Sequence, residues 1–313
     1  MSSPTSLTEA DVRRLLDPAK LLVAIEAAFR GRYPSIAIPP RLDIPLADGI
    51  FLAMSCYDRS GHTLGIKLVK VRDHPTPNEG GIHATYLLLD SDTAQPSLTV
   101  AANYLTDIRT AATSAVATKF LARENPSTLG IFGTGRLART HLHLLPFIRN
   151  FQRVLVCGRD AARSASFVEQ HAAALPQGFV TAADARTCAA ESDVLCTCTA
   201  SPAPLFDGRL LRPGTHLNLT GAFQPHRREV DTHTIQRARV VVDTYAEAPS
   251  AGDLSIPMQE GAIARDHIVC DLHELVSGKK QGRRNPDDIT VFKSVGCALE
   301  DLVAAELLLS AQS

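Results

Sequence analysis

Glycines at a regular spacing form the clearest chemical pattern in the sequence. Gly133, Gly135 and Ala138 in LGIFGTGRLA fill the pattern G-x-G-x-x-G/A, after an apolar strand pattern and before a helical one. The first glycine permits a tight turn, the second lets the backbone approach a pyrophosphate, and the third small residue lets helix and strand pack closely. The helix N-terminus adds free N–H groups. We therefore expect Gly133, Thr134 and Gly135 to bind a dinucleotide. The alternative is a glycine-rich turn in another doubly wound fold.

The end of the next predicted strand, RVLVC at 153–157, bears on the choice of dinucleotide. An NAD site usually carries Asp or Glu there, about 20 residues after the glycines, to hold the ribose hydroxyls. Here the strand is followed by Gly158 and Arg159, and Asp160 comes one step later. A guanidinium pairs with a phosphate through two parallel hydrogen bonds. Gly158 and Arg159 therefore favour NADPH, with NADH as the alternative. Arg159 could also be a solvated turn residue.

Three cationic side chains lie among apolar or small residues outside the glycine-rich segment. Lys67 is in the middle of the strand pattern TLGIKLVKV, Arg109 lies in an Ala-rich helix pattern, and Arg41 follows two prolines. A lysine on a partly enclosed face needs a nearby anion or a chemical task. The three cations could together hold a carboxylate, or they could be separate structural residues in salt bridges.

The elements that would position the glycines follow residue 106. Short apolar strand patterns alternate there with helical patterns: RVLVC (153–157), DVLCTCT (193–199), THLNLT (215–220) and RVVVD (239–243). This alternation is typical of an α/β fold, a Rossmann-type doubly wound parallel sheet with helices on both faces. We assign residues 116–295 to this dinucleotide-binding domain.

The first 115 residues have a different pattern, which predicts an α+β domain. A helix is expected over 8–33, capped by Thr8 and bent or restarted at Pro18. Mainly antiparallel strands are expected at 49–56, 64–71 and 82–90, with a polar turn at 72–81. The final amphipathic helix, near 299–310, is expected to pack back on this domain, so residues 296–313 rejoin it.

Length and composition exclude several classes of protein. The chain has 313 residues, enough for about two domains, and a net charge of −1 gives no overall field for nucleic acid or an anionic membrane. Seven cysteines without a CxxC pair predict no metal site and suggest a reducing compartment. We find no apolar run near the ~18 residues of a membrane span and no signal peptide, so a cytoplasmic protein is expected.

Longer motifs resemble those of the ornithine cyclodeaminase/mu-crystallin family over nearly the whole chain. They are PPR at 39–41, LGIKLV at 64–69, YLTDIRTAATSAVATKFLAR at 104–123, GTGRLA at 133–138, TCTAS at 197–201, GAFQPHRREVD at 221–231, EAPSAGDL at 247–254 and LHELVSGKKQGRRNPDDITVFKSVGCALEDL at 272–302. The resemblance implies a homodimer in which the N-terminal domain, rejoined by the C-terminal helix, binds the substrate and pairs the subunits.

The resemblance also implies roles for individual residues. Arg41, Lys67 and Arg109 match the family's substrate-carboxylate cluster, and Val295 matches a residue near the substrate. Cofactor contacts are implied for Arg109, Arg136, Leu137, Thr199, Asn218, Leu219, Thr220 and Ser294, in addition to the glycine-rich segment.

One departure from the family pattern bears on the reaction. Cyclodeaminases carry an Asp two residues before the proline of this segment, and here the segment is GAFQP with Phe223 at that position. A phenyl ring can neither accept nor donate a proton. The pattern therefore resembles the branch that reduces cyclic imino acids such as pyrroline- or piperideine-2-carboxylate. The alternatives are an ornithine cyclodeaminase, an open-chain amino-acid dehydrogenase such as alanine dehydrogenase, and a non-catalytic binding protein that holds NADPH and a small ligand.

The expected mechanism uses the three cations. Arg41 and Arg109 would hold the α-carboxylate, and Lys67, or a water that it orients, would supply or stabilise the proton on the imine nitrogen. Two neighbouring arginines should lower the pKa of Lys67. His83 could relay protons but is more simply explained as a structural histidine, and KKQGRR (279–284) as a solvated loop.

Overall fold

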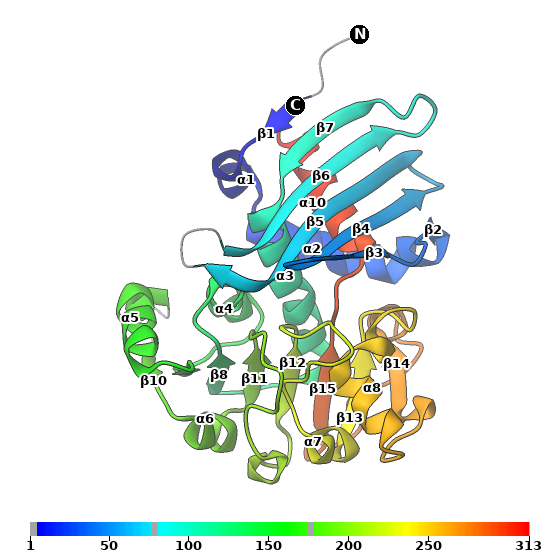
Figure 1. The fold of residues 1–313 in the computed structure, drawn as a ribbon. Helices are drawn as coiled ribbons and strands as arrows, with labels where there is room; N and C mark the ends of the chain where they lie inside the picture. Colours follow the sequence, from blue (N-terminus) through cyan, green and yellow to red (C-terminus); the bar gives the residue numbers. More distant parts are fainter. Residues whose placement is uncertain (1–4, 77–79, 175–177, 313) are drawn as a thin grey trace. The chain divides into compact units, whose positions relative to one another are not determined.

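The computed structural model describes residues 5–76, 80–174 and 178–312 and divides into two compact units. Unit 1 comprises Met1–Arg109 with Gly296–Ser313, and unit 2 comprises Thr110–Val295 (Figure 1). The division falls inside helix α3 (Asn103–Leu121), which also contains the boundary expected at residue 115. Residues 77–79 of the expected polar turn lie outside the described residues.

Unit 2 is built on a parallel sheet of eight strands in the order β10-β9-β8-β11-β12-β15-β13-β14. The strands are β8 (Thr128–Phe132), β9 (Arg153–Cys157), β10 (Phe179–Ala182), β11 (Val194–Thr197), β12 (His216–Leu219), β13 (Ala238–Val242), β14 (Ile268–Asp271) and β15 (Ile289–Lys293). β8, β11, β12 and β15 are buried at every residue, as expected where both faces of a parallel sheet are covered. The Rossmann-type class is confirmed, and β10, β14 and β15 add three strands to those named from the sequence.

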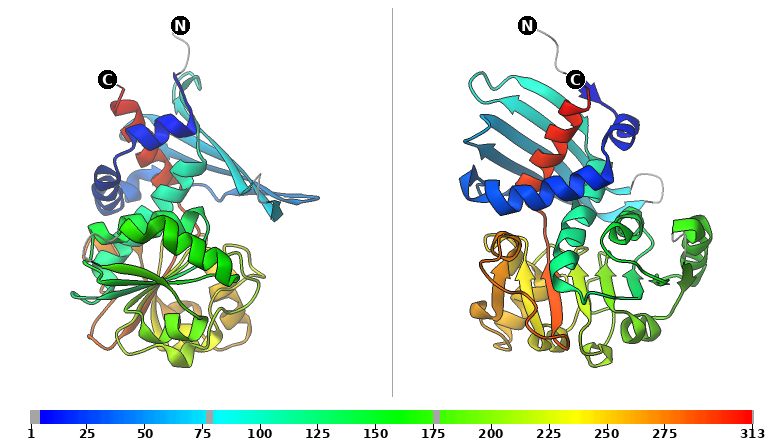
Figure 2. Two further views of the ribbon diagram at one scale, coloured as in Figure 1. Left: turned by 90° about the vertical axis from the view of Figure 1, so that its left-hand side faces the viewer. Right: turned by 180° about the vertical axis from the view of Figure 1, so that it is seen from behind.

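Helices cover both faces of this sheet (Figure 2). They are α4 (Arg136–Leu144), α5 (Ala161–His171), α6 (Ala185–Glu191), α7 (Thr232–Arg237), α8 (Gly252–Gln259) and α9 (Leu272–Val276). The helices α5, α6 and α7 each begin after an aspartate, and the carboxylate of Asp160, Asp184 or Asp231 accepts a backbone N–H of the first turn. Helix α4 has no side-chain cap. The first turn of α4 therefore differs from those of α5, α6 and α7 in having no carboxylate at its N-terminus.

Unit 1 contains a largely antiparallel sheet in the order β1-β7-β6-β5-β4-β2, with β3 also paired to β4. Its elements are β1 (Thr5–Leu7), α1 (Glu9–Leu15), α2 (Pro18–Ala27), β2 (Ile36–Ala37), β3 (Leu42–Leu46), β4 (Gly49–Asp58), β5 (Thr63–Thr76), β6 (Gly80–Asp90), β7 (Pro96–Ala101) and α10 (Ala298–Ser310). The expected single helix is two helices, because Asp17 caps a new helix that begins at Pro18.

The last helix of the chain, α10, packs on one face of the unit 1 sheet and against α2 (Figure 2, right). The C-terminal helix therefore lies with the elements of unit 1. Within the described residues, we find no helix with the length and apolar character needed to cross a lipid bilayer.

Candidate functional site

The carboxyl ends of β8 and β11 meet at the point where the strand order of unit 2 reverses. β9 follows β8 along the chain but lies on one side of it, whereas β11 lies on the other. Such a switch point is where open α/β sheets bind ligands. Gly133 follows β8 with φ +118°, and a Cβ there would lie 2.7 Å from the carbonyl oxygen of Cys198, which follows β11. Glycine is therefore required at this position by both conformation and space.

Gly135, in contrast, has open space beside its Cα, because a Cβ there would meet nothing within 4 Å. This residue is the N-cap of α4, where Arg136 and Leu137 form the first turn, and no side chain caps the helix. Open space beside uncapped N–H groups suits a phosphate. The residues present at this turn therefore fit the pyrophosphate of a dinucleotide.

Of the three residues that follow β9, two form structural contacts and one is exposed. Gly158 packs against the turn, since a Cβ there would lie 2.9 Å from Cγ2 of Thr134, and its N–H donates to Oγ of Ser164 at 2.9 Å. Asp160 uses its carboxylate to cap α5, accepting the N–H of Arg163 at 3.1 Å. Arg159 is exposed. The acidic residue that could hold ribose hydroxyls is thus engaged, and a cation is free to face solvent.

The predicted cofactor contacts after the other strands fall into two groups. Three of them, Thr199, Thr220 and Ser294, follow strand ends at this same edge of the sheet, as does Val295, which was predicted to lie near the substrate. Asn218 and Leu219 instead lie inside β12 with fully buried side chains, and Nδ2 of Asn218 donates to Oγ1 of Thr118 at 2.9 Å. The side chains of these two residues therefore belong to the interior of the sheet and not to its loop edge.

In unit 1, Lys67 and Arg109 meet two carboxylates under α10. Lys67 is on β5, on the sheet face that α10 covers, opposite Met54 and Tyr86 on the neighbouring strands. Its Nζ lies 2.8 Å from Oδ2 of Asp301 and 3.0 Å from Oδ1. The Nε of Arg109 donates to the same Oδ1 at 2.9 Å. One carboxylate therefore holds both predicted cations in place.

Glu300 completes this cluster of four charges. A second nitrogen of Arg109 donates to Oε2 of Glu300 at 2.5 Å. All four side chains are at least 96% buried, and their formal charges sum to zero. Burial lowers the pKa of Lys67 to about 8, and the charge of Arg109 adds to this effect. The pKa of Lys67 is therefore lowered, as expected from the sequence, but burial contributes more to this shift than the charge of Arg109 does.

Two further residues complete the description of the cations. Gly296 has φ +90°, and a Cβ there would lie 2.6 Å from a terminal nitrogen of Arg109, so the backbone itself supports the guanidinium. Arg41 precedes β3 and forms an ion pair with Asp43, with 3.3 Å between Nε and Oδ1. The sequence reasoning did not identify Glu300 and Asp301, although two adjacent acids in the apolar helix pattern CALEDLVAAELLL are a signal for buried counter-ions.

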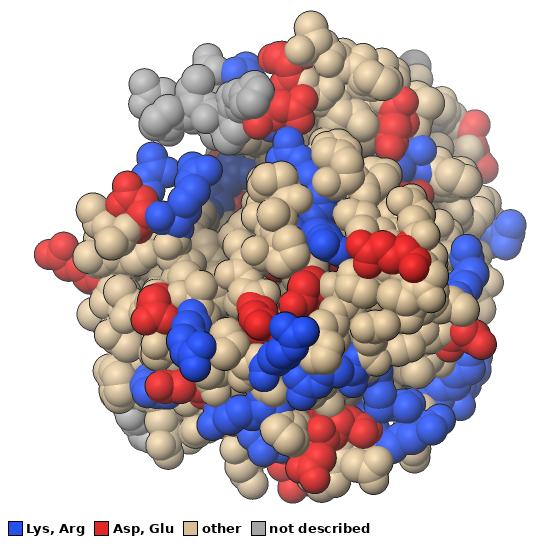
Figure 3. Space-filling model, turned by 60° about the horizontal axis from the view of Figure 1, so that its bottom comes forward, with Lys and Arg blue, Asp and Glu red and all other residues tan. Residues whose placement is uncertain are grey.

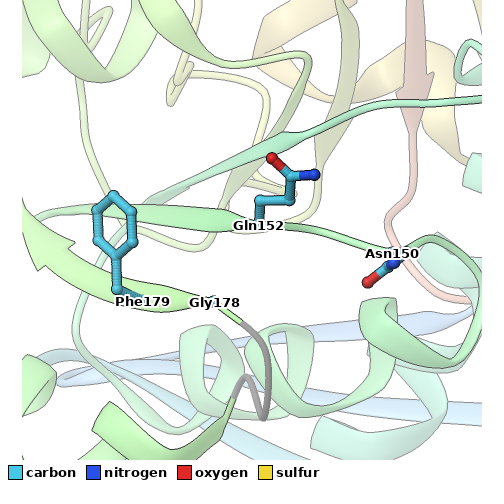
Figure 4. Close-up of a pocket in the computed structure, with 4 residues that line it drawn as sticks. All are labelled: Asn150, Gln152, Gly178 and Phe179. Atoms are coloured by element: carbon cyan, nitrogen blue, oxygen red, sulfur yellow. The ribbon is translucent and has the colours of Figure 1, made fainter.

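Other features lie away from these residues. The pocket in Figure 4 is lined by Asn150, Gln152, Gly178 and Phe179, which are at the amino ends of β9 and β10 and so at the opposite edge of the sheet. His83 is exposed on β6. Among the described residues, no group of three or more His, Cys, Asp or Glu side chains is arranged to hold a metal ion.

The basic segment 279–284 is bound up in structural contacts. Lys280 pairs with Glu274 at 3.0 Å, and Arg283 donates to backbone carbonyls, including those of Leu121 at 2.6 Å and Gly214 at 3.0 Å. Figure 3 shows acidic side chains among the basic ones on the face that it presents. The positive charges on this face are therefore partly compensated.

Known proteins resemble this chain over most of its length. The sequence profile of the "Ornithine cyclodeaminase/mu-crystallin family" matches residues 3–311. The Delta(1)-pyrroline-2-carboxylate reductase of Bacillus cereus is 33% identical over 275 residues, which are 86% of this chain and 84% of that protein.

Solved structures are also similar to this chain over most of its length. The Delta(1)-pyrroline-2-carboxylate reductase of Thermococcus litoralis, in complex with NADH and L-proline, has a TM-score of 0.93 and 32% identity over 98% of this chain and 97% of its own. An archaeal alanine dehydrogenase dimer with bound NAD has a TM-score of 0.92 and 26% identity over 98% of this chain and 95% of its own. Over residues 3–311, this chain belongs to the ornithine cyclodeaminase/mu-crystallin family.

Proposed function

We propose that this protein is an NADPH-dependent reductase of cyclic imino acids, converting Δ1-pyrroline-2-carboxylate to L-proline or Δ1-piperideine-2-carboxylate to L-pipecolate. The observation that carries the proposal is the buried cluster of Lys67, Arg109, Glu300 and Asp301, in a chain whose relatives bear the name of this reductase. In this proposal, the part of the chain at 1–115 and 296–313 binds the substrate, and 116–295 binds the cofactor.

The charge balance of the cluster suits such a substrate. The protonated form of a cyclic imino acid carries one positive nitrogen and one carboxylate, so its binding adds no net charge to a neutral buried cluster. An isolated charge in such a place is costly. Ornithine would bring an additional ammonium group, and Phe223 stands where a cyclodeaminase carries an aspartate. The cluster and Phe223 therefore both favour imine reduction over cyclodeamination.

We assign the following roles to the chain's own residues. Arg41 and Arg109 hold the α-carboxylate, which orients the ring. Lys67 holds the proton at the imine nitrogen, because a C=N carbon accepts a hydride readily only when its nitrogen is protonated. A pKa of about 8 lets Lys67 exchange a proton near neutral pH. The bound nicotinamide supplies the hydride.

The preference for NADPH over NADH rests on the end of β9. The solved relatives named above hold NADH or NAD, so NAD(H) is the cofactor class of those proteins. In this chain Asp160 caps α5, and the exposed Arg159 is next to Gly158. A guanidinium at this position pairs with a 2′-phosphate.

We also propose a homodimer in the cytoplasm, formed through the unit 1 sheet. Leu42, Ile44 and Leu46 on β3 are 57%, 42% and 39% exposed. The register aligns Leu42 with Ala53 and Ile44 with Phe51, on the face opposite to the one that α10 covers. A contiguous apolar face of this kind is typical of an interface between subunits. Sedimentation of wild type and Ile44→Asp tests it, with a dimer expected only for wild type.

Oxidation of NADPH in the presence of each candidate substrate tests the reaction. We expect turnover with pyrroline-2-carboxylate or piperideine-2-carboxylate and little with pyruvate plus ammonia, the substrate of an alanine dehydrogenase. Ammonia release from ornithine serves as the control for a cyclodeaminase. Ammonia and proline production without imine reduction would refute the proposal, and ligand binding without any turnover would indicate the binding protein.

A further inference from the structure

A buried carboxylate joins two of the loops at the cofactor edge of unit 2. Glu229 is fully buried, and its Oε1 accepts the N–H of Thr199 at 2.8 Å and the hydroxyl of the same residue at 2.7 Å. Its Oε2 accepts the hydroxyl of Thr197 at 2.8 Å and the N–H groups of Gly221 and Ala222 at 2.8 and 3.2 Å. One side chain therefore binds the residues that follow β11 and those that follow β12.

The two strand ends that Glu229 joins are in close contact. A Cβ on Gly221 would lie 2.1 Å from the carbonyl oxygen of Thr199 and 2.5 Å from Oε1 of Glu229.

An ionised carboxylate is an acceptor without donors, which matches five donors directed at it. An amide at this position would turn two N–H groups toward other donors. The geometry of these loops thus depends on a carboxylate and not merely on a polar group of the same size.

A second carboxylate and a lysine hold Glu229 itself. The N–H groups of Glu229 and Val230 donate to Oδ1 of Asp253 at 2.7 and 3.2 Å. Nζ of Lys293, the last residue of β15, donates to Oδ2 of Asp253 at 2.9 Å and to the carbonyl oxygen of Ala222. Glu229, Asp253 and Lys293 are all fully buried. This network connects the ends of β11, β12 and β15 without reaching solvent.

The position of these loops relates them to one half of the cofactor. A doubly wound sheet binds a dinucleotide across the switch point, with one mononucleotide on each half of the sheet. The glycine turn and the end of β9 belong to the half that binds adenosine. The loops after β11 and β12 belong to the other half. We infer that Glu229 is a positioning residue for the nicotinamide half of the cofactor: its carboxylate fixes the Thr199 and Gly221 loops against which the ring is bound.

This inference rests on the proposed use of a nicotinamide dinucleotide. Binding measurements test the role of Glu229 separately from that proposed function. NADH and ADP-ribose differ only in the nicotinamide, so their dissociation constants isolate its contribution. For Glu229→Gln we expect a loss of about tenfold or more in NADH affinity, with less than about a twofold change for ADP-ribose. Loss of both ligands to the same extent, or of neither, would overturn the inference. Failure of the wild type to bind NADPH as well as these two ligands would instead refute the cofactor proposal.

Asp231→Asn is a matched control from the same segment. Its carboxylate also accepts three hydrogen bonds, from the N–H of Gly208 and from the N–H and hydroxyl of Thr234, but these partners lie in the 208–210 turn and in α7. We expect this variant to keep the ratio of NADH to ADP-ribose affinity. An equal loss of that ratio in Asp231→Asn would show general destabilisation and overturn the inference.

Thr197→Val provides a milder change should Glu229→Gln not fold. Thr197 is fully buried, and the substitution removes the hydrogen bond that its hydroxyl donates to Glu229. We expect NADH affinity to fall by about twofold to fivefold while ADP-ribose affinity is retained. An unchanged NADH affinity in a folded Thr197→Val protein would count against the role of Glu229.

Discussion

Removing the Asp301 carboxylate should move the pH dependence of imine reduction. Asp301 raises the pKa of Lys67 by its charge and by a hydrogen bond, against the lowering caused by burial and by Arg109. Unit charges 2.8 Å apart attract by about 6 kcal/mol at an effective dielectric constant of about 20, equivalent to roughly 4 pKa units. The amide of Asp301→Asn still accepts a hydrogen bond and recovers part of this energy, so we expect the pKa of Lys67 to fall by about 1–3 units.

The assay is the pH profile of kcat/KM for the imine, measured with NADPH oxidation. If protonated Lys67 acts at the imine nitrogen, the wild-type rate should fall above about pH 8, and the Asp301→Asn profile should fall at a lower pH. The substrate's own ionisation is the same in both experiments, so a difference between the profiles belongs to the protein. An alkaline limb that stays in place, or moves to higher pH, would refute the role assigned to Lys67.

Glu300→Gln is the control for loss of a buried charge. It removes a carboxylate from the same cluster, but Glu300 contacts Arg109 rather than Lys67 and has a weaker effect on the pKa of the lysine. We expect a clearly smaller shift of the alkaline limb. Breaking a buried pair costs about 3–5 kcal/mol, so thermal melts of both variants must show that they are folded under the conditions of the assay.

Four further predictions concern substitutions at the cofactor turn, at the end of β9 and at the substrate side. Arg159→Ala should weaken NADPH binding by about 1.5–3 kcal/mol, roughly 10- to 150-fold, and leave NADH nearly unchanged; equal losses in titrations with the two cofactors would exclude a phosphate contact. Gly135→Ala should fold with the wild-type melting temperature yet bind NAD(P)H more weakly. Gly133→Ala should lower the melting temperature itself, because a Cβ on Gly133 meets the backbone and a Cβ on Gly135 does not. Arg41→Ala should raise KM for the imine in steady-state kinetics with little change in cofactor affinity, and an unchanged KM would make Arg41 a structural residue. Phe223→Asp should lose much of its imine reduction in the NADPH assay, since burial of a carboxylate beside an apolar ring is unfavourable, and full retention of activity would remove Phe223 from the substrate site.

Features that depend on residues close together in the chain could be predicted from the amino-acid sequence. The glycine-rich turn was readable because a tight turn, an approach to phosphate and helix–strand packing each place a requirement on one position within a few residues. The parallel sheet was readable from apolar strand patterns that alternate with helices. The strands β10, β14 and β15 were not named, because FVTA, IVCD and ITVFK are short apolar segments that periodicity alone does not distinguish from a buried helical turn. Pro18 was read as a bend or restart, and the cap by Asp17 decided for a restart.

The pairing of the buried charges could not be predicted from the sequence, because it depends on how the elements pack. Lys67 and Asp301 are separated by 234 residues, and Arg109 and Glu300 by 191, so no local pattern connects them. They meet because α10 packs on the sheet face that carries Lys67. The same holds for Glu229, whose partners come from the ends of two strands. A buried charge needs a partner wherever the fold brings one, and the identity of that partner depends on which elements pack together, which is a property of the whole chain.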